Sequence, residues 1–216
     1  MTGKPFETAH RPNINYGCTI LNDSPCLMKT TIVATGAGRS GTTMLSRVMS
    51  AIGVDLGKNL TPETREDKGL QVAVKSGDVA AFEQICRQYD VRRKKWGFKC
   101  PPIRSRLLTF NPLMRNPRYI VIFRDLLAVG LRNNMAIGGD LLSAMHESAL
   151  SYAATIAQLQ QLQQPALLIS YEKALQYPQR TVSVIAGFCG QPLTDDRIAE
   201  IAAETITASD PRYLAK

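Results

Sequence analysis

The feature that most constrains this chain is a glycine-rich loop between an apolar β-branched run and an amphipathic helical pattern. The run covers residues 30–33, the loop at 36–43 reads GAGRSGTT, and apolar residues recur at helical spacing from Met44 to Ile52. In a parallel α/β fold such a loop lies at the carboxyl end of the first strand, with the helix N-terminus directed at the ligand. Backbone amides and the positive end of the helix dipole favour a phosphate there. The unit therefore predicts an anion-binding loop.

Short apolar runs alternate with helical patterns along the rest of the chain. The runs are Val54 with Leu56, then 96–98, 119–123 and 166–169, and the helical patterns cover 80–89, 126–135 and 141–164. Continuous apolar strands separated by helices are typical of a parallel sheet covered on both faces. We predict one α/β domain at residues 29–216, with a mostly parallel sheet of about five strands flanked by helices in a P-loop-like nucleotide-binding fold. Residues 1–28 are expected to form an irregular N-terminal extension.

The charge balance indicates an anionic substrate or partner. The 216 residues carry a formal net charge of +8, from 26 lysines and arginines against 18 acidic residues. The basic residues are scattered, with one short cluster at 92–95, and aromatic residues make up only 6% of the chain. This pattern does not favour a nucleic-acid partner, which usually requires a basic patch interleaved with aromatic residues.

Cysteine and histidine usage argues against two common kinds of site. The five cysteines form no C-x-x-C pair, and the only histidines are His10 and His146. We therefore expect free thiols, no zinc site and no Ser-His-Asp triad. No apolar run approaches the ~18 residues of a membrane span, and the N-terminus lacks a signal-peptide pattern, so a cytoplasmic protein is predicted.

The glycine loop by itself fits two general nucleotide-binding patterns. Gly36, Gly38 and Gly41 satisfy G-x-G-x-x-G, with Asp55 about 20 residues beyond the first glycine, as in NAD-binding dehydrogenases. The same loop satisfies the P-loop pattern of kinases, except that Thr42 stands in place of the lysine. A kinase also needs a carboxylate-held magnesium ion, and no apolar run here ends in a convincing metal-binding aspartate.

Residues 36–43 also resemble the 5′-phosphosulfate loop of the sulfotransferases that use 3′-phosphoadenosine 5′-phosphosulfate (PAPS), which reads much like G-x-x-[RK]-S-G-T-T. The resemblance implies PAPS as the sulfuryl donor, no metal, and a role for Arg39 in catalysis as well as in cofactor binding. It assigns the 5′-phosphate to residues 38–43, namely Gly38, Arg39, Ser40, Gly41, Thr42 and Thr43. A single phosphate can be held without the P-loop lysine, because amides, hydroxyls and one guanidinium suffice.

Two further segments resemble the same family. Residues 118–132, RYIVIFRDLLAVGLR, resemble the 3′-phosphate motif, in which Arg124 matches the arginine at the strand end. The family usually has a serine eight residues later, where this chain has Arg132, which keeps an anion donor. The stretch LLISYEKALQYP at 167–178 resembles the segment that places a tyrosine beside the adenine, which points to Tyr171.

The catalytic groups are also implied by the resemblance. The run WGFKCP at 96–101 resembles the W-G-x-K-x-P segment of the bacterial and Golgi carbohydrate-type branch, whose lysine reaches the sulfuryl group, and it points to Lys99. The segment LTPETRED at 60–67 lies where related enzymes place the general base, which favours Glu63, with Glu66 and Asp67 as alternatives. The branch often continues with G-Y-F-E, whereas here Leu-Gln-Val follows Gly69, which leaves the acceptor pocket undefined.

Together the motifs predict transfer of a sulfuryl group from PAPS to a hydroxyl or amine of a small-molecule or glycan acceptor. A metal-dependent P-loop kinase and a non-catalytic nucleotide-binding relative are the alternatives. The sequence does not identify the acceptor or the oligomeric state.

Overall fold

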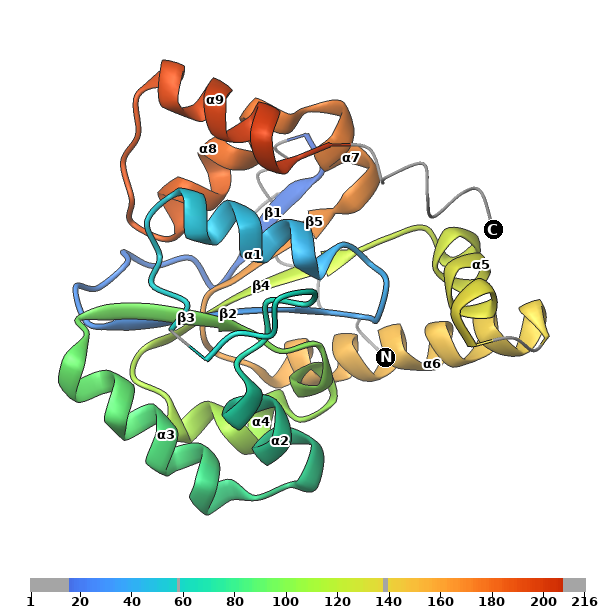
Figure 1. The fold of residues 1–216 in the computed structure, drawn as a ribbon, viewed down its shortest axis with the longest axis horizontal. Helices are drawn as coiled ribbons and strands as arrows, with labels where there is room; N and C mark the ends of the chain where they lie inside the picture. The colour runs from blue at the N-terminus through green and yellow to red at the C-terminus, as the bar shows by residue number, and fades with distance from the viewer. Residues whose placement is uncertain (1–15, 58, 138–139, 208–216) are drawn as a thin grey trace, which may run out of the picture.

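A computed structural model of the protein describes residues 16–57, 59–137 and 140–207. Its centre is a five-stranded sheet in the order β1-β5-β4-β2-β3 (Figure 1). The strands are β1 (Cys18–Leu21), β2 (Thr30–Gly36), β3 (Lys95–Lys99), β4 (Pro117–Phe123) and β5 (Ala166–Ser170). The pairs β2–β3, β2–β4 and β4–β5 are parallel, and β1 pairs antiparallel with β5 at one edge. The predicted fold class is confirmed.

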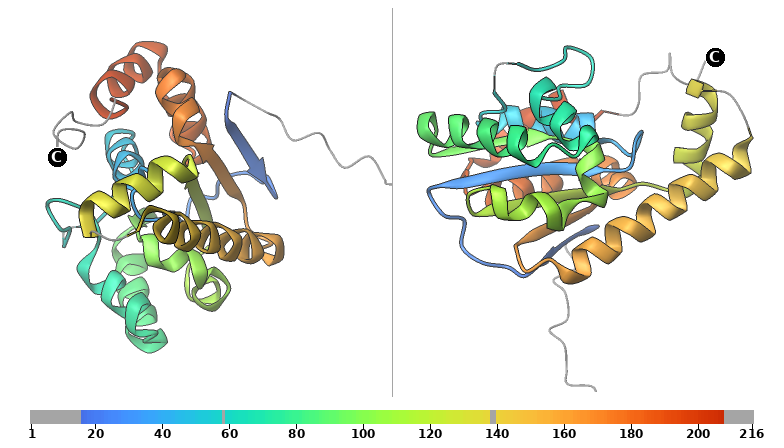
Figure 2. Two further views of the ribbon diagram at one scale, coloured as in Figure 1. Left: turned by 90° about the vertical axis from the view of Figure 1, so that its right-hand side faces the viewer. Right: turned by 90° about the horizontal axis from the view of Figure 1, so that it is seen from below.

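Helices cover both faces of the sheet (Figure 1). One face carries α1 (Thr42–Ala51), α7 (Tyr171–Gln176), α8 (Pro178–Phe188) and α9 (Asp195–Thr205). The other face carries α2 (Lys68–Ser76), α3 (Val79–Arg92), η1 (Pro101–Ser105), α4 (Leu107–Phe110) and η2 (Asn111–Leu113). Helices α5 (Leu126–Ile137) and α6 (Leu141–Gln161) follow β4, and α6 runs along this second face and beyond it (Figure 2).

The two central strands explain why the sequence shows continuous rather than alternating apolar runs. Every residue of β2 is buried, as is most of β4. Along β4, Ile120 and Ile122 pack toward α1 and α8, whereas Tyr119 and Val121 pack toward α3 and α4. A strand buried on both faces has no solvent-facing positions for polar residues.

Two predictions about elements were wrong. The run at Val54 and Leu56 is buried but forms no strand, because the backbone of 54–55 bonds to the end of α1 and to Gly97 instead of a strand ladder. The fifth strand is β1, at residues 18–21, where an irregular extension was expected. Thr19 and Ile20 lie opposite Leu168 and Leu167 on the outer edge of β5. The part of the predicted extension at residues 1–15 lies outside the described residues.

The predicted helix at 141–164 ends slightly earlier than expected. Helix α6 stops at Gln161, and Leu162 already has an extended backbone. The chain then turns through Pro165 into β5, and a proline disfavours helical geometry in the residue that precedes it. Among the described residues, no helix combines the length and the apolar character that crossing a bilayer would require.

Candidate active site

The glycine loop links β2 to α1 as predicted and is closed by its own hydrogen bonds. The Ser40 hydroxyl and amide both donate to the Ala37 carbonyl oxygen, at 2.7 and 3.2 Å. Arg39 has a φ of 65° and Gly41 a φ of 105°, so the chain turns sharply before α1 begins at Thr42. No side chain caps the N-terminus of α1. Its first amide groups are therefore available to an anion.

Gly41 is required by a close approach as well as by its backbone angle. A Cβ atom at this position would lie 2.4 Å from Cδ2 of Tyr171. Tyr171 is the first residue of α7 and is 6% exposed, so its ring lies packed against the loop. The structure thus places Tyr171 at the loop, and its buried ring supports the loop backbone.

Arg124 reaches the loop from the neighbouring strand. Strand β4 lies beside β2, and Arg124 follows its last residue. One guanidinium nitrogen donates to the carbonyl oxygen of Arg39 at 3.2 Å, and the guanidinium carbon lies 4.4 Å from the centre of the Tyr171 ring. The Nε atom of Arg124 is buried and has no hydrogen-bond acceptor in the part of the chain that the structure describes. The two predicted anion-binding segments are therefore adjacent in space, and Arg124 retains an unused donor.

The backbone of Arg124 is held by a residue that the sequence patterns did not indicate. The Tyr152 hydroxyl, from α6, accepts a hydrogen bond from the Arg124 amide at 3.0 Å and donates one to the Arg124 carbonyl at 2.8 Å. Burial raises the pKa of Tyr152, which keeps the hydroxyl protonated. Arg132 lies on α5, eight residues further along the chain, and is partly buried.

Lys99 forms a buried ion pair with Glu66. Lys99 is the last residue of β3 and lies opposite Ala34 of β2, so it shares the carboxyl edge of the sheet with the loop. Its ammonium donates to Oε1 of Glu66 at 2.6 Å, and the two side chains are only 2% and 6% exposed. Burial lowers the pKa of Lys99, and the Glu66 carboxylate partly offsets this effect. Gln71 donates to the second carboxylate oxygen of Glu66.

The three acidic candidates for the general base have different surroundings. Glu63 is exposed, whereas Glu66 and Asp67 are buried. Asp67 caps α2 by accepting from the Leu70 amide at 2.9 Å, and it also accepts from the Tyr89 hydroxyl. Asp67 is thus engaged in structure, and Glu66 is the acid that the fold brings to Lys99.

A cavity of about 490 Å³ adjoins the loop. Ala37 and Gly38 of the loop line it together with Asp140, which caps α6, and with polar and small residues on α6, including Glu147 and Ser151. Gly38 is exposed, and a Cβ atom there would meet nothing within 4 Å. The loop backbone therefore faces open space of a size that suits a small-molecule ligand.

Arg104 adds a cation to this cavity that no sequence motif indicated. It lies in η1, five residues after Lys99, and its Nε donates to the Ser151 hydroxyl at 2.6 Å. A second nitrogen donates to the Pro101 carbonyl at 2.9 Å, and burial lowers the pKa of the guanidinium. Among the described residues, no group of three or more His, Cys, Asp and Glu side chains is placed to hold a metal ion.

Comparison with known proteins gives matches at the level of structure. No family model matches the chain, and no curated protein matches it by sequence. A sulfotransferase domain from the curacin biosynthetic pathway matches with a TM-score of 0.57 and 18% identity, covering 89% of this chain and 87% of that domain. The sulfotransferase domain of the Synechococcus PCC 7002 olefin synthase matches with a TM-score of 0.60 and 17% identity, covering 90% and 85%.

A third solved structure is that of mouse sulfotransferase SULT7A1 complexed with PAP. It matches with a TM-score of 0.56 and 17% identity, covering 85% of this chain and 67% of the mouse chain. At sequence identities this low, such matches show a shared fold only. The arrangement of sheet, loop and flanking helices identifies this chain as having the fold of the sulfotransferases.

Proposed function

We propose that this protein transfers a sulfuryl group from PAPS to a hydroxyl or amine of a small acceptor. The observation that carries the proposal is the meeting of two anion-binding elements at one edge of the sheet. The uncapped N-terminus of α1 offers backbone amides, and Arg124 reaches the same loop with a buried, unused N–H group. A nucleotide with phosphates at two positions would satisfy both elements. The likeness to sulfotransferase structures, one of them complexed with PAP, supports this choice.

The residues present fit such a cofactor. We assign the 5′-phosphate to the loop residues 38–43 and the 3′-phosphate to Arg124 with Arg132, while Tyr171 supports the loop. When bound, PAPS supplies the sulfuryl group. Arg39 and Lys99 are placed in this proposal to stabilise negative charge that grows on the leaving phosphate and the sulfuryl oxygens. None of these roles requires a metal ion.

We propose Glu66, rather than Glu63, as the general base. In the free protein the charges of Lys99 and Glu66 offset one another at 2.6 Å. An anionic group at the loop competes with Glu66 for the Lys99 ammonium. A Glu66 carboxylate released from this pair has a free oxygen for the proton of an acceptor hydroxyl. Glu63 is exposed and forms no ion pair with a described residue, so donor binding has no such partner through which to affect it.

The acceptor is assigned to the cavity beside the loop. Its lining combines apolar surface with charged groups, namely the Arg104 guanidinium and the carboxylates of Asp140, which caps α6, and of Glu147 on α6. Such a lining suits an acceptor that carries a hydroxyl or amine group beside apolar surface, as a carbohydrate or a small metabolite does.

Thermal unfolding with three nucleotides tests the proposed cofactor. Adenosine 3′,5′-bisphosphate (PAP) at a hundred times its Kd should stabilise the protein by about 2.7 kcal/mol, with no change on adding EDTA. A P-loop kinase would instead respond to ATP with magnesium, and EDTA would abolish the response. NADH is the control for a dehydrogenase.

A matched pair of variants then tests the 3′-phosphate site. Arg124→Ala should weaken binding of PAP but leave 5′-AMP, which lacks the 3′-phosphate, nearly unaffected. Arg87→Ala removes the same charge from an exposed ion pair on α3 and should behave as wild type. Equal losses for both nucleotides in Arg124→Ala would contradict the assignment. Binding of PAP without turnover on a broad acceptor panel would identify a non-catalytic relative.

A further inference from the structure

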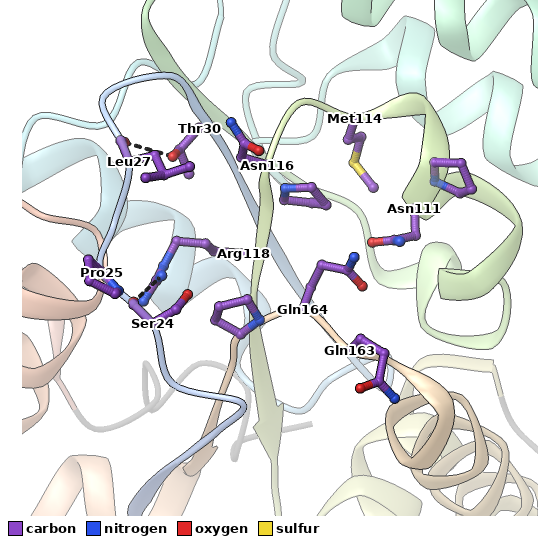
Figure 3. A pocket seen from close by; sticks show the side chains of 13 residues that line it. Ser24, Pro25, Leu27, Thr30, Asn111, Met114, Asn116, Arg118, Gln163 and Gln164 are labelled. Carbon is purple, nitrogen blue, oxygen red and sulfur yellow. Dashed lines mark hydrogen bonds between the residues drawn. The ribbon is translucent and has the colours of Figure 1, made fainter.

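A second cavity lies at the opposite end of the sheet from the glycine loop. It has a volume of about 380 Å³ and is lined by residues at the amino ends of β2 and β4 and just before β5 (Figure 3). Arg118 of β4 lines this cavity, whereas Arg124 at the other end of β4 contacts the loop. The two arginines are six positions apart along extended chain, which corresponds to about 20 Å. This cavity is therefore separate from the proposed PAPS site.

Arg118 is a buried cation whose charge is not balanced by a carboxylate among the described residues. It is 5% exposed, and one terminal nitrogen donates to the Ser24 carbonyl oxygen at 2.7 Å. The guanidinium lies over the ring of Phe188, 4.2 Å from its centre, and its Nε atom is buried with no acceptor within residues 16–57, 59–137 and 140–207. Among the described residues no carboxylate forms an ion pair with it. A carbonyl and an aromatic ring only partly compensate a buried charge.

The rest of the lining also suits an anion. No Asp or Glu lies among the described residues around the cavity. Figure 3 shows Arg118 and Ser24 on one side and the carboxamides of Asn111 and Gln163 on the other. The carboxamide oxygen of Asn111 accepts from the Tyr119 hydroxyl at 2.8 Å, which leaves its NH₂ group as a donor for a ligand. These groups supply hydrogen-bond donors around a single positive charge.

We propose that this cavity binds a small organic oxyanion, with its carboxylate or phosphate at Arg118 and hydroxyl groups at the carboxamides. The volume exceeds what an inorganic ion needs and lies within the range of small-molecule sites. A guanidinium has five N–H donors in a planar fork, so an oxyanion at Arg118 would use donors that the protein leaves unused. The inference does not depend on the proposed function, because the two sites share no residue.

The test measures anion binding with the glycine loop occupied and unoccupied. Glycerol 3-phosphate and citrate are titrated into the 216-residue chain with and without saturating PAP, against sodium chloride at equal ionic strength. At ten times its Kd, a bound anion should raise Tm by about 3–6 °C in both series. Arg118→Met should lose this rise, and Arg118→Lys should retain a weaker one. Arg87→Met, which removes an exposed charge, should keep the full response.

A spectroscopic readout makes the test independent of variant stability. The Nε–H resonance of Arg118, assigned by its loss in Arg118→Lys, should shift on anion addition to the wild-type protein. An unshifted resonance, or an equal rise in Tm for wild type and Arg118→Met, would overturn the proposal. A response that PAP abolishes would place the anion at the loop and would also overturn it. If PAP itself does not bind, the Arg118 resonance still decides the matter.

Discussion

At the scale of single residues, the Lys99–Glu66 pair is the most informative feature of the site. Both side chains are buried and paired at 2.6 Å, at the end of the strand next to the glycine loop. Removing one partner of a buried pair leaves an uncompensated charge, which typically costs about 3–5 kcal/mol. Tests of this pair should therefore use substitutions that keep a hydrogen-bonding group in place.

Glu66→Gln separates catalysis from structure. A glutamine can still accept from Lys99 but cannot take up a proton, so sulfuryl transfer should fall about 10²–10⁴-fold while PAP still raises Tm. Glu63→Gln is the matched control. Its rate of sulfuryl transfer should stay within about threefold of wild type, as expected for an exposed side chain that takes no part in the proposed reaction. Steady-state turnover with PAPS checks both variants. The reverse pattern would restore Glu63 as the base.

The lowered pKa of Lys99 predicts a specific pH dependence of stability. Between its folded-state pKa and the usual 10.5, the unfolded chain binds this proton more tightly than the folded chain does. The contribution of Lys99 to the free energy of unfolding should therefore rise with pH up to about 10.5. Above that pH the side chain is neutral in both states, and burying it no longer carries the cost of a charge. Urea unfolding of wild type and of Lys99→Gln, which keeps a donor for Glu66 but does not titrate, gives the difference across this window. Identical pH slopes in the two proteins would contradict the burial effect.

At the scale of elements, the start of α2 determines where Glu66 lies. Asp67 caps this helix through the Leu70 amide and also accepts from the Tyr89 hydroxyl of α3. The adjacent Glu66 is directed to Lys99 on β3. One capping residue thus joins two helices and orients the proposed base.

Asp67→Ala should destabilise the protein by about 2–4 kcal/mol, since it removes a helix cap and leaves the Tyr89 hydroxyl without an acceptor. Asp67→Asn keeps a capping oxygen and should cost less, and Tyr89→Phe removes only the second contact. Urea denaturation of the three variants measures the effects. A change of under about 0.5 kcal/mol in Asp67→Ala would show that the cap contributes little.

At the scale of the whole molecule, strand β1 forms one edge of the sheet and covers β5. It pairs with β5 over residues 18–21, and Cys18 is buried in the core. Its loss would leave the outer N–H and C=O groups of β5 unpaired, which favours edge-to-edge association. The stable domain is therefore predicted to need residues upstream of the boundary expected at residue 29.

A shortened chain that begins at Lys29 should unfold at a Tm about 4–8 °C below that of the full chain, because it loses the apolar burial of β1. It should also form larger species in light scattering. A chain that begins at Tyr16 keeps β1, so it should unfold at a higher Tm than the chain that begins at Lys29 and should scatter less light. If the chain that begins at Lys29 were as stable and as monodisperse as the full chain, the domain boundary expected from the sequence would be supported.

Much of the fold and the loop followed from the sequence alone, because these features are local. The strand, loop and helix at residues 30–52 are contiguous, and their periodicity determines both the fold class and the position of the loop. Lys99 and Arg124 each lie at the end of an apolar run, and parallel strands bring such ends to one edge.

Only the tertiary structure decided which separate segments meet. Residues 60–67 contain three acids and no regular periodicity, so the chain does not reveal that Glu66 is buried against Lys99 while Glu63 is exposed. Tyr152 and Arg104 reach the site through the packing of α6 and η1, and β1 is defined by its pairing with β5, some 145 residues away along the chain. Local patterning reports which face of an element is buried. The choice of partner depends on contacts between distant residues, which periodicity does not encode.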